Sequence, residues 1–298
     1  MENLEGLRRR LETARSLHSL VRTMKALASV SIHQYEEATR SLAHYDQVVE
    51  LGFEVALRRW EPVAQLLEPR DPGHLGAVVF GSSQGLAGRF NDQIVRLATG
   101  RIEQIAPERL TLLVLGPFVG EFLEAEGFVP DRSLELPGSV QAIEAGVQDL
   151  VVEVETWRHE LGVDRVLLFY NLHSTGARFT PHTQRLLPLD PAWLEELTRR
   201  PWGGPSLPTS PLEPERLFGA LVREHLFVAS YRAFAESLAS EHASRLAAMQ
   251  AAEKNVEERI DDLQHRYHQL RQSVVTEELM DIMAGFEALE GSSTPPYV

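Results

Sequence analysis

Residues 215–290 contain no proline and carry apolar side chains at helical spacing, and residues 1–61 share both properties. Each segment therefore predicts one long helix. At 1.5 Å per residue the two helices would extend roughly 110 and 90 Å, whereas a compact globule of this length has a radius of gyration of about 19 Å. We therefore expect both helices to stand out from any globular body.

Both helical segments carry an apolar seam through which they can pair. The C-terminal seam follows steps of four and three residues through Val256, Ile260, Leu263, Tyr267, Leu270 and Val274, and after a one-residue shift through Val275, Leu279, Ile282, Phe286 and Leu289. The looser N-terminal seam consists of Leu4, Leu7, Leu11, Ala14, Leu17, Val21, Met24, Ala28, Ile32, Tyr35, Leu42, Tyr45 and Val49. Because about 150 residues separate the segments, we expect an antiparallel coiled coil with the intervening chain folded at one end.

The middle of the chain predicts an α/β domain. Near-continuous apolar strands are expected at 74–80, 110–116 and 163–171, with helical stretches around 90–105, 117–126 and 139–161. Apolar strands alternating with helices indicate a mostly parallel sheet covered on both faces. Residues 178–189 are expected to add an edge strand, because Pro181 is tolerated there.

The expected fold is thus a central, mostly parallel α/β sheet domain plus a long antiparallel coiled coil formed by the N- and C-terminal helices. Five prolines in residues 201–214 indicate a linker into the last helix. The expected divisions are an N-terminal helix at 1–61, an α/β domain at 62–213, a C-terminal helix at 214–290 and a disordered tail at 291–298.

Composition excludes several classes of protein. A hydrophobic content of 43% with 24% charged residues is typical of a folded chain, and the net charge of -14 argues against nucleic-acid binding. No apolar run approaches the 18 residues of a membrane span, and the first 25 residues do not have the pattern of a secretory signal. The absence of cysteine excludes disulfides and thiolate metal sites.

The glycine-rich segment 81–88 follows an expected strand and precedes an expected helix, a position that often binds phosphate. It lacks the Gly-Lys-Ser/Thr ending of a Walker loop and the G-x-G-x-x-G spacing of a dinucleotide site. We therefore assign Gly85, Gly88 and Asn91 to turn geometry and helix entry. The histidines form no HExxH pair and no serine lies in a G-x-S-x-G elbow. No catalytic residue, metal or cofactor is expected.

Four segments resemble the gamma subunit of F-type ATP synthases. The longest is SLASEHASRLAAMQAAEKNVEERIDDLQHRYHQLRQSVVTEELMDIMAG at 237–285, and the others are VRTMKALASVS at 21–31, GSSQGLAGRFN at 81–91 and QRLLPLD at 184–190. Their order and spacing agree with that family over essentially the whole chain. Ser83-Gln84 stands where the family usually has Asp-Arg, which leads to the hypothesis of a divergent gamma from an alternate F-type ATPase.

The resemblance implies a non-catalytic rotor. Its helices would form a shaft inside a ring of alpha and beta subunits, and its α/β domain would sit on a membrane c ring, with epsilon as a further partner. It would have no membrane span of its own and would be peripheral on the cytoplasmic face of a bacterial plasma membrane. By matching position, the residues implied to contact the alpha/beta ring are Arg22, Met24, Lys25, Arg271, Gln272, Thr276 and Glu278.

Two other classes of protein remain open from the residues alone. One is a nucleotide-using α/β enzyme, which would bind ATP or NAD through residues 81–91. The other is a free-standing coiled-coil scaffold, which would associate with itself and need no ring subunits.

Overall fold

The computed structural model describes residues 3–59, 73–163, 165–174, 176–204 and 206–291. The expected boundary at residues 61–62 lies outside this range. The expected tail at 291–298 also lies outside it, apart from Gly291, which ends a helix. None of the described helices is both long enough and apolar enough to cross a membrane.

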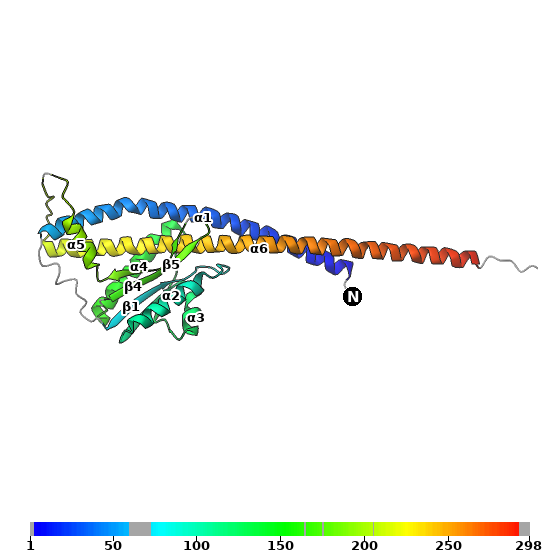
Figure 1. Ribbon diagram of the computed structural model, residues 1–298, viewed down its shortest axis with the longest axis horizontal. Helices are drawn as coiled ribbons and strands as arrows, with labels where there is room; N and C mark the ends of the chain where they lie inside the picture. The colour runs from blue at the N-terminus through cyan, green and yellow to red at the C-terminus, as the bar shows by residue number, and fades with distance from the viewer. Residues whose placement is uncertain (1–2, 60–72, 164, 175, 205, 292–298) are drawn as a thin grey trace, which may run out of the picture. The chain divides into compact units, whose positions relative to one another are not determined.

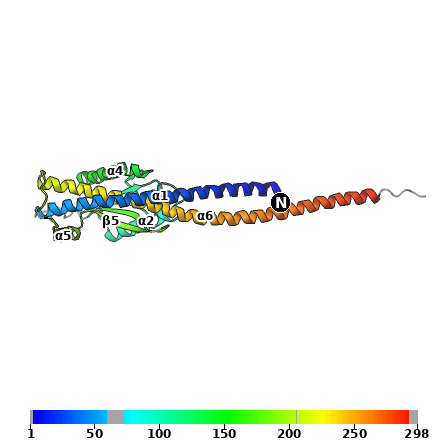
Figure 2. The same cartoon turned by 90° about the horizontal axis from the view of Figure 1, so that it is seen from above.

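Two long helices, α1 (Leu4–Arg59) and α6 (Pro214–Gly291), begin and end close to the positions expected from the sequence. Contacts divide the chain into two units, one made of residues 1–26 and 249–298 and the other of residues 27–248. In each unit, residues further along α1 contact residues earlier in α6, so the two helices pair in antiparallel orientation as predicted. Figures 1 and 2 show the two helices side by side.

In the first unit the helices meet through an apolar seam. Its members are Leu7, Leu11 and Leu263, with Ala14, Ile260, Tyr267 and Leu270 packed against them. Leu17, expected in this seam, is instead 47% exposed, and the partly buried His18 lies beside it. A strict repeat of 3.5 residues per turn would place Leu17 between the two helices. The α-helix has about 3.6 residues per turn, so His18 faces the partner helix instead.

The second unit contains a five-stranded sheet. Its strands are β1 (His74–Phe80), β2 (Arg109–Leu115), β3 (Arg132–Leu134), β4 (Arg165–His173) and β5 (Phe179–Leu187), in the order β3-β2-β1-β4-β5. All neighbouring pairs are parallel except β4 with β5. The mostly parallel sheet is therefore confirmed, and Pro181 lies in the antiparallel edge strand. The three-residue strand β3 is too short for sequence periodicity to indicate.

Short helices lie between the strands, and one more follows the last strand. They are α2 (Phe90–Ile105), α3 (Val119–Ala125), the 3-10 turn η2 (Val140–Ala142), α4 (Ile143–Thr156), the π-helical turn η3 (Trp157–Leu161) and α5 (Pro191–Arg199). Helix α5 was not expected from the sequence. Its start is nevertheless marked, because the Asp190 side chain accepts a hydrogen bond from the Ala192 amide and Pro191 occupies the first turn.

Alternate residues of β1 face two different helical layers. Val78 and Phe80 belong to a core shared with α4 and with residues 226–239 of α6, whereas Ala77 and Val79 belong to a core shared with α2 and α3. Figure 1 shows α2 and α3 on the side of the sheet away from α6. The middle of α6 is therefore one layer of the α/β domain as well as half of the helix pair.

Candidate functional site

Two of the N-terminal residues that the resemblance implies to contact the ring, Arg22 and Lys25, lie beside a glutamate of α6. The Lys25 ammonium donates a hydrogen bond to the Glu253 carboxylate, and Arg22 Nε lies 3.9 Å from the same carboxylate. The Lys25 hydrogen bond is the main cause that lowers the pKa of Glu253. The Arg22 side chain is 68% exposed and Met24 is partly buried. Arg22 therefore presents charge outward, whereas Lys25 is engaged inside the helix pair.

His18, Glu253 and Glu257 form a cluster that sequence motifs did not indicate. Their possible ligand atoms all lie within 4.8 Å of one another, and His18 Nε2 is 3.1 Å from Glu257 Oε1. A divalent ion would have to displace the ammonium of Lys25 from Glu253. We therefore interpret the cluster as a network of ion pairs between the two helices.

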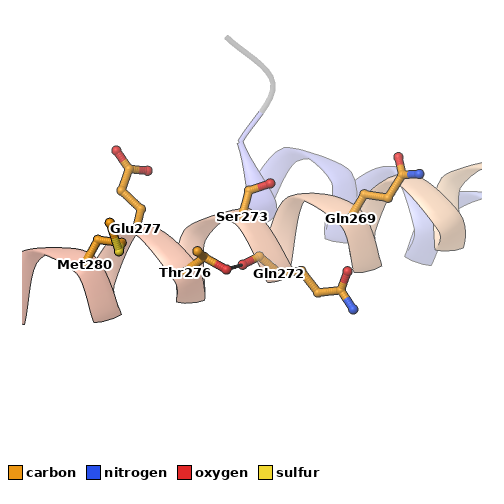
Figure 3. A pocket seen from close by; sticks show the side chains of 6 residues that line it. All are labelled: Gln269, Gln272, Ser273, Thr276, Glu277 and Met280. Carbon is orange, nitrogen blue, oxygen red and sulfur yellow. Dashed lines mark hydrogen bonds between the residues drawn. The ribbon is translucent and has the colours of Figure 1, made fainter.

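The C-terminal residues that the resemblance implies to contact the ring, Arg271, Gln272, Thr276 and Glu278, are all exposed on α6. The Thr276 hydroxyl donates to the backbone carbonyl of Gln272 over 2.8 Å, and Gln269, Ser273, Glu277 and Met280 line the same open hollow (Figure 3). Eighteen residues separate Glu253 from Arg271, roughly 27 Å along an α-helix. The residues matched by resemblance therefore form two separate patches.

The glycine-rich loop makes a tight turn into α2. Leu86 and Gly88 have positive φ angles of 61° and 59°, and a Cβ on Gly88 would lie 3.4 Å from the Ser244 hydroxyl. The Asn91 side chain accepts from the Ser82 amide at 2.9 Å and donates to the Ser82 hydroxyl at 3.0 Å. Nothing lies within 4 Å of a Cβ built on Gly85.

The carboxylate of Glu241 on α6 accepts hydrogen bonds from the loop amides that a bound phosphate would need. It accepts from the amides of Ser83 at 2.9 Å and Gln84 at 3.2 Å, and it is fully buried. A second negative group in the same place would be repelled. From the sequence, Glu241 was expected, together with His242, to be exposed to solvent on a charged helix. The structure shows that this expectation was wrong for Glu241, because the loop packs over its carboxylate.

A partly buried histidine, His242, follows Glu241 on the same helix. The His242 ring stacks on Tyr35 of α1 with centroids 5.6 Å apart, and its Nδ1 lies 3.2 Å from Arg245 Nη1. Burial lowers the pKa of His242 to about 4. The ring is therefore neutral at pH 7, and its Nδ1 can accept a hydrogen bond from the guanidinium.

These features define the class of protein. An α/β domain packs on an antiparallel pair of long helices, and the helices carry exposed polar and apolar side chains. The glycine-rich loop binds the carboxylate of Glu241 in place of a ligand. The ATP synthase family model matches residues 3–289. The ATP synthase gamma chain of Anaeromyxobacter sp. (strain K) is 30% identical, over 97% of this chain and all of that protein. The gamma chain of Nostoc punctiforme is 27% identical over the same shares.

Solved structures agree with this fold. A chain of the Euglena gracilis mitochondrial ATP synthase, solved as OSCP/F1/c-ring, has a TM-score of 0.65 at 17% identity, covering 99% of this chain and 97% of that one. A chain of the Tetrahymena thermophila central stalk and c-ring has a TM-score of 0.55 at 22% identity, covering 78% and 99%. The present chain belongs to the ATP synthase gamma chain family. It is a gamma chain, the non-catalytic central-stalk subunit of ATP synthase.

Proposed function

We propose that this chain is a rotor that couples ion flow to ATP chemistry performed by other subunits. It would turn inside a ring of alpha and beta subunits, contact an epsilon subunit and engage a membrane c ring through its α/β domain. Residues 1–61 and 214–290 would form the shaft and residues 62–213 the foot. The complex would lie on the cytoplasmic face of a bacterial plasma membrane. Support for this location comes from bacterial relatives such as those of Anaeromyxobacter and Nostoc.

The observation that carries the proposal is an uncovered apolar face near the end of α6. Val275, Leu279, Met280, Ile282 and Met283 are between 46% and 62% exposed. The apolar cluster that joins α6 to α1 in the same unit extends only to Leu270 among the described residues. Contiguous exposed apolar side chains favour contact with another protein. A ring that encloses this part of α6 would remove them from water.

Polar contact residues accompany this apolar face. Arg271 and Gln272 offer directional donors for carboxylates or carbonyls of a partner, and Thr276 and Glu278 follow them on exposed positions of α6. Arg22 and Met24, with the partly exposed Lys25, would form a second patch on α1. Because the polar side chains differ around the helix pair, three equivalent ring subunits would each contact a different face of it. Each subunit would then be stabilised in a different conformation.

Co-expression with alpha and beta subunits from the same source tests the proposal. We expect a stoichiometric complex that hydrolyses ATP and drives rotation of the chain. The double substitution Arg271→Ala with Gln272→Ala should weaken assembly by about tenfold, since hydrogen bonds to charged groups contribute about 1.5–3 kcal/mol. Arg101→Ala, on exposed α2, is the matched control and should assemble normally.

Two results would count against the proposal. One is a chain that is folded and stable alone but forms no complex with the ring subunits, which would favour the scaffold alternative. The other is a double variant that assembles and hydrolyses ATP as well as the Arg101→Ala control.

A further inference from the structure

The loop between β1 and α2 is joined to α6 by a buried carboxylate. Glu241 accepts three hydrogen bonds from the loop: from the Ser83 amide at 2.9 Å, the Ser83 hydroxyl at 2.9 Å and the Gln84 amide at 3.2 Å. Its side chain has no exposed surface. These bonds connect residues about 158 positions apart, so they tie the end of a strand to the long helix.

A guanidinium completes the connection. Arg245 Nη2 donates to Glu241 Oε1 at 2.5 Å and to the backbone carbonyl of Gln84 at 3.3 Å, and its side chain is 4% exposed. One position earlier on the same helix, the Ser244 hydroxyl donates to the carbonyl of Ala87 at 2.5 Å. Donors and acceptors of the loop are thus both held by α6.

The other side of the loop is held as firmly. Asn91 of α2 makes two hydrogen bonds with Ser82. Between these anchors Leu86 keeps a φ of 61°, a conformation that a residue with a branched side chain adopts only where its surroundings hold it. The loop therefore has little freedom to move relative to either helix.

A buried charge pair is an unusual way to attach a helix to a sheet. Replacing such pairs by apolar residues of similar size is often neutral or stabilising, so stability alone does not explain it. Apolar contacts are non-directional and allow small rotations of a helix about its axis, whereas charge-assisted hydrogen bonds hold a fixed orientation. The five bonds made by Glu241 and Arg245 to each other and to the loop at 3.3 Å or less oppose such a rotation.

We propose that Glu241 and Arg245, with the loop from Ser82 to Ala87, form the joint that passes torque between the α/β domain and α6. This rests on the rotor function proposed above. Both residues are positioning residues: they keep the foot and the helix at one angle while load is applied. Packing of Phe80 against Phe234 would hold the two parts together, and the charged joint would stop them from twisting.

The joint can be tested in the assembled complex by its torsional stiffness. The chain has no cysteine, so Arg101→Cys on α2 gives a unique point for attaching a bead to the α/β domain while the ring is fixed to a surface. The width of the angular distribution during pauses at low ATP reports the stiffness between bead and ring. Glu241→Gln keeps the shape of the side chain but removes its charge, and we expect it to broaden this distribution.

Two further variants keep the test decisive. Ser83→Ala removes one hydrogen bond of the joint and should broaden the distribution less than Glu241→Gln, so it serves if the latter does not fold. Arg223→Ala removes an ion pair of 2.9 Å with Glu155 that also links α6 to the α/β domain, but at an exposed position. Because solvent screens that pair, this control should leave the distribution unchanged.

The outcomes separate the two proposals. If the unsubstituted chain neither assembles nor rotates, the rotor function fails. If it rotates, and Glu241→Gln folds, assembles and gives the same angular width as Arg223→Ala, the joint proposal is overturned. A broader distribution for Glu241→Gln than for Arg223→Ala, in complexes that assemble to the same extent, would support the joint. A purely structural role would lower stability but leave the stiffness of the folded rotor unchanged.

Discussion

The rings of Phe80 on β1 and Phe234 on α6 meet edge to face, with centroids 5.0 Å apart and planes inclined by 82°. Both side chains are fully buried. Edge-to-face contact adds to the energy of apolar burial, so this pair is a main point of attachment between the sheet and the long helix.

Phe234→Ala is expected to lower the free energy of unfolding by about 3–5 kcal/mol, because it leaves a cavity in a core that cannot fully collapse. Urea unfolding followed by circular dichroism measures the change. Phe122→Ala removes the same group from α3, where the ring is 43% exposed, and should change stability by less than about 1 kcal/mol. Equal losses in the two variants would show that α6 is not part of the α/β core.

Lys25→Ala is expected to lower the thermal midpoint more than Lys254→Ala. These are the only two lysines in the chain. Lys25 donates to Glu253 across the helix pair, whereas Lys254 is 78% exposed and lies 3.9 Å from Glu258 on its own helix. Differential scanning calorimetry at low and high salt measures both. The Lys25 effect should shrink in high salt, since salt screens partly exposed pairs.

The same pair predicts a pH dependence. The folded-state pKa of Glu253 lies below its ordinary value, so its contribution to stability is present above pH 4.5 and is lost as the pH falls through the lowered pKa. Lys25→Ala should remove this contribution, and the stability curves of variant and parent should converge in acid. Curves that stay parallel between pH 5 and the acid limit would contradict the assignment.

His242 predicts a second pH dependence. Its pKa is about 4 in the folded chain against 6.5 unfolded, so only the unfolded chain binds the proton between these values. Its effect on stability is therefore absent above pH 6.5 and grows as the pH falls to 4, reaching on the order of 3 kcal/mol of destabilisation at about 1.4 kcal/mol per pKa unit.

His242→Phe keeps a ring against Tyr35 but cannot be protonated. The slope of unfolding free energy against pH between 4 and 6.5 should be smaller in this variant than in the parent, as measured by urea unfolding at several pH values. His33→Phe is the control, because it makes the same replacement at a side chain that is 79% exposed. An unaltered slope in His242→Phe would mean that His242 is protonated in the folded chain.

Substituting Leu279 and Ile282 by Glu is expected to impair assembly without destabilising the isolated chain. The two side chains are 56% and 58% exposed, so they add little to the chain's own core. If a ring covers them, each contributes about 1.5–3 kcal/mol to binding, or about tenfold or more in affinity. Pull-down with tagged ring subunits measures this, and Val129→Glu, at a position 74% exposed on the α/β domain, is the control. Normal assembly of the double variant would show that this face of α6 stays in water.

The sequence by itself determined the features that depend on neighbouring residues. Helical periodicity without proline set the extents of α1 and α6, and short apolar runs located β1, β2 and β4 to within two residues. Pro181 indicated the edge strand, and resemblance over nearly the whole chain indicated the family. These signals are local because hydrogen-bond patterns in a helix or strand repeat within a few residues.

Only the tertiary structure decided which side chains meet across long stretches of chain. In the structure, Leu17 is exposed and Lys25 donates a hydrogen bond to Glu253. The Glu241 carboxylate accepts hydrogen bonds from the amides of Ser83 and Gln84. In the sequence, Glu241 and Arg245 are two of many charged residues of the last helix. Their burial depends on how the sheet packs against α6, and no local pattern records that arrangement, because it is set by the balance of apolar burial and hydrogen bonding over the whole domain.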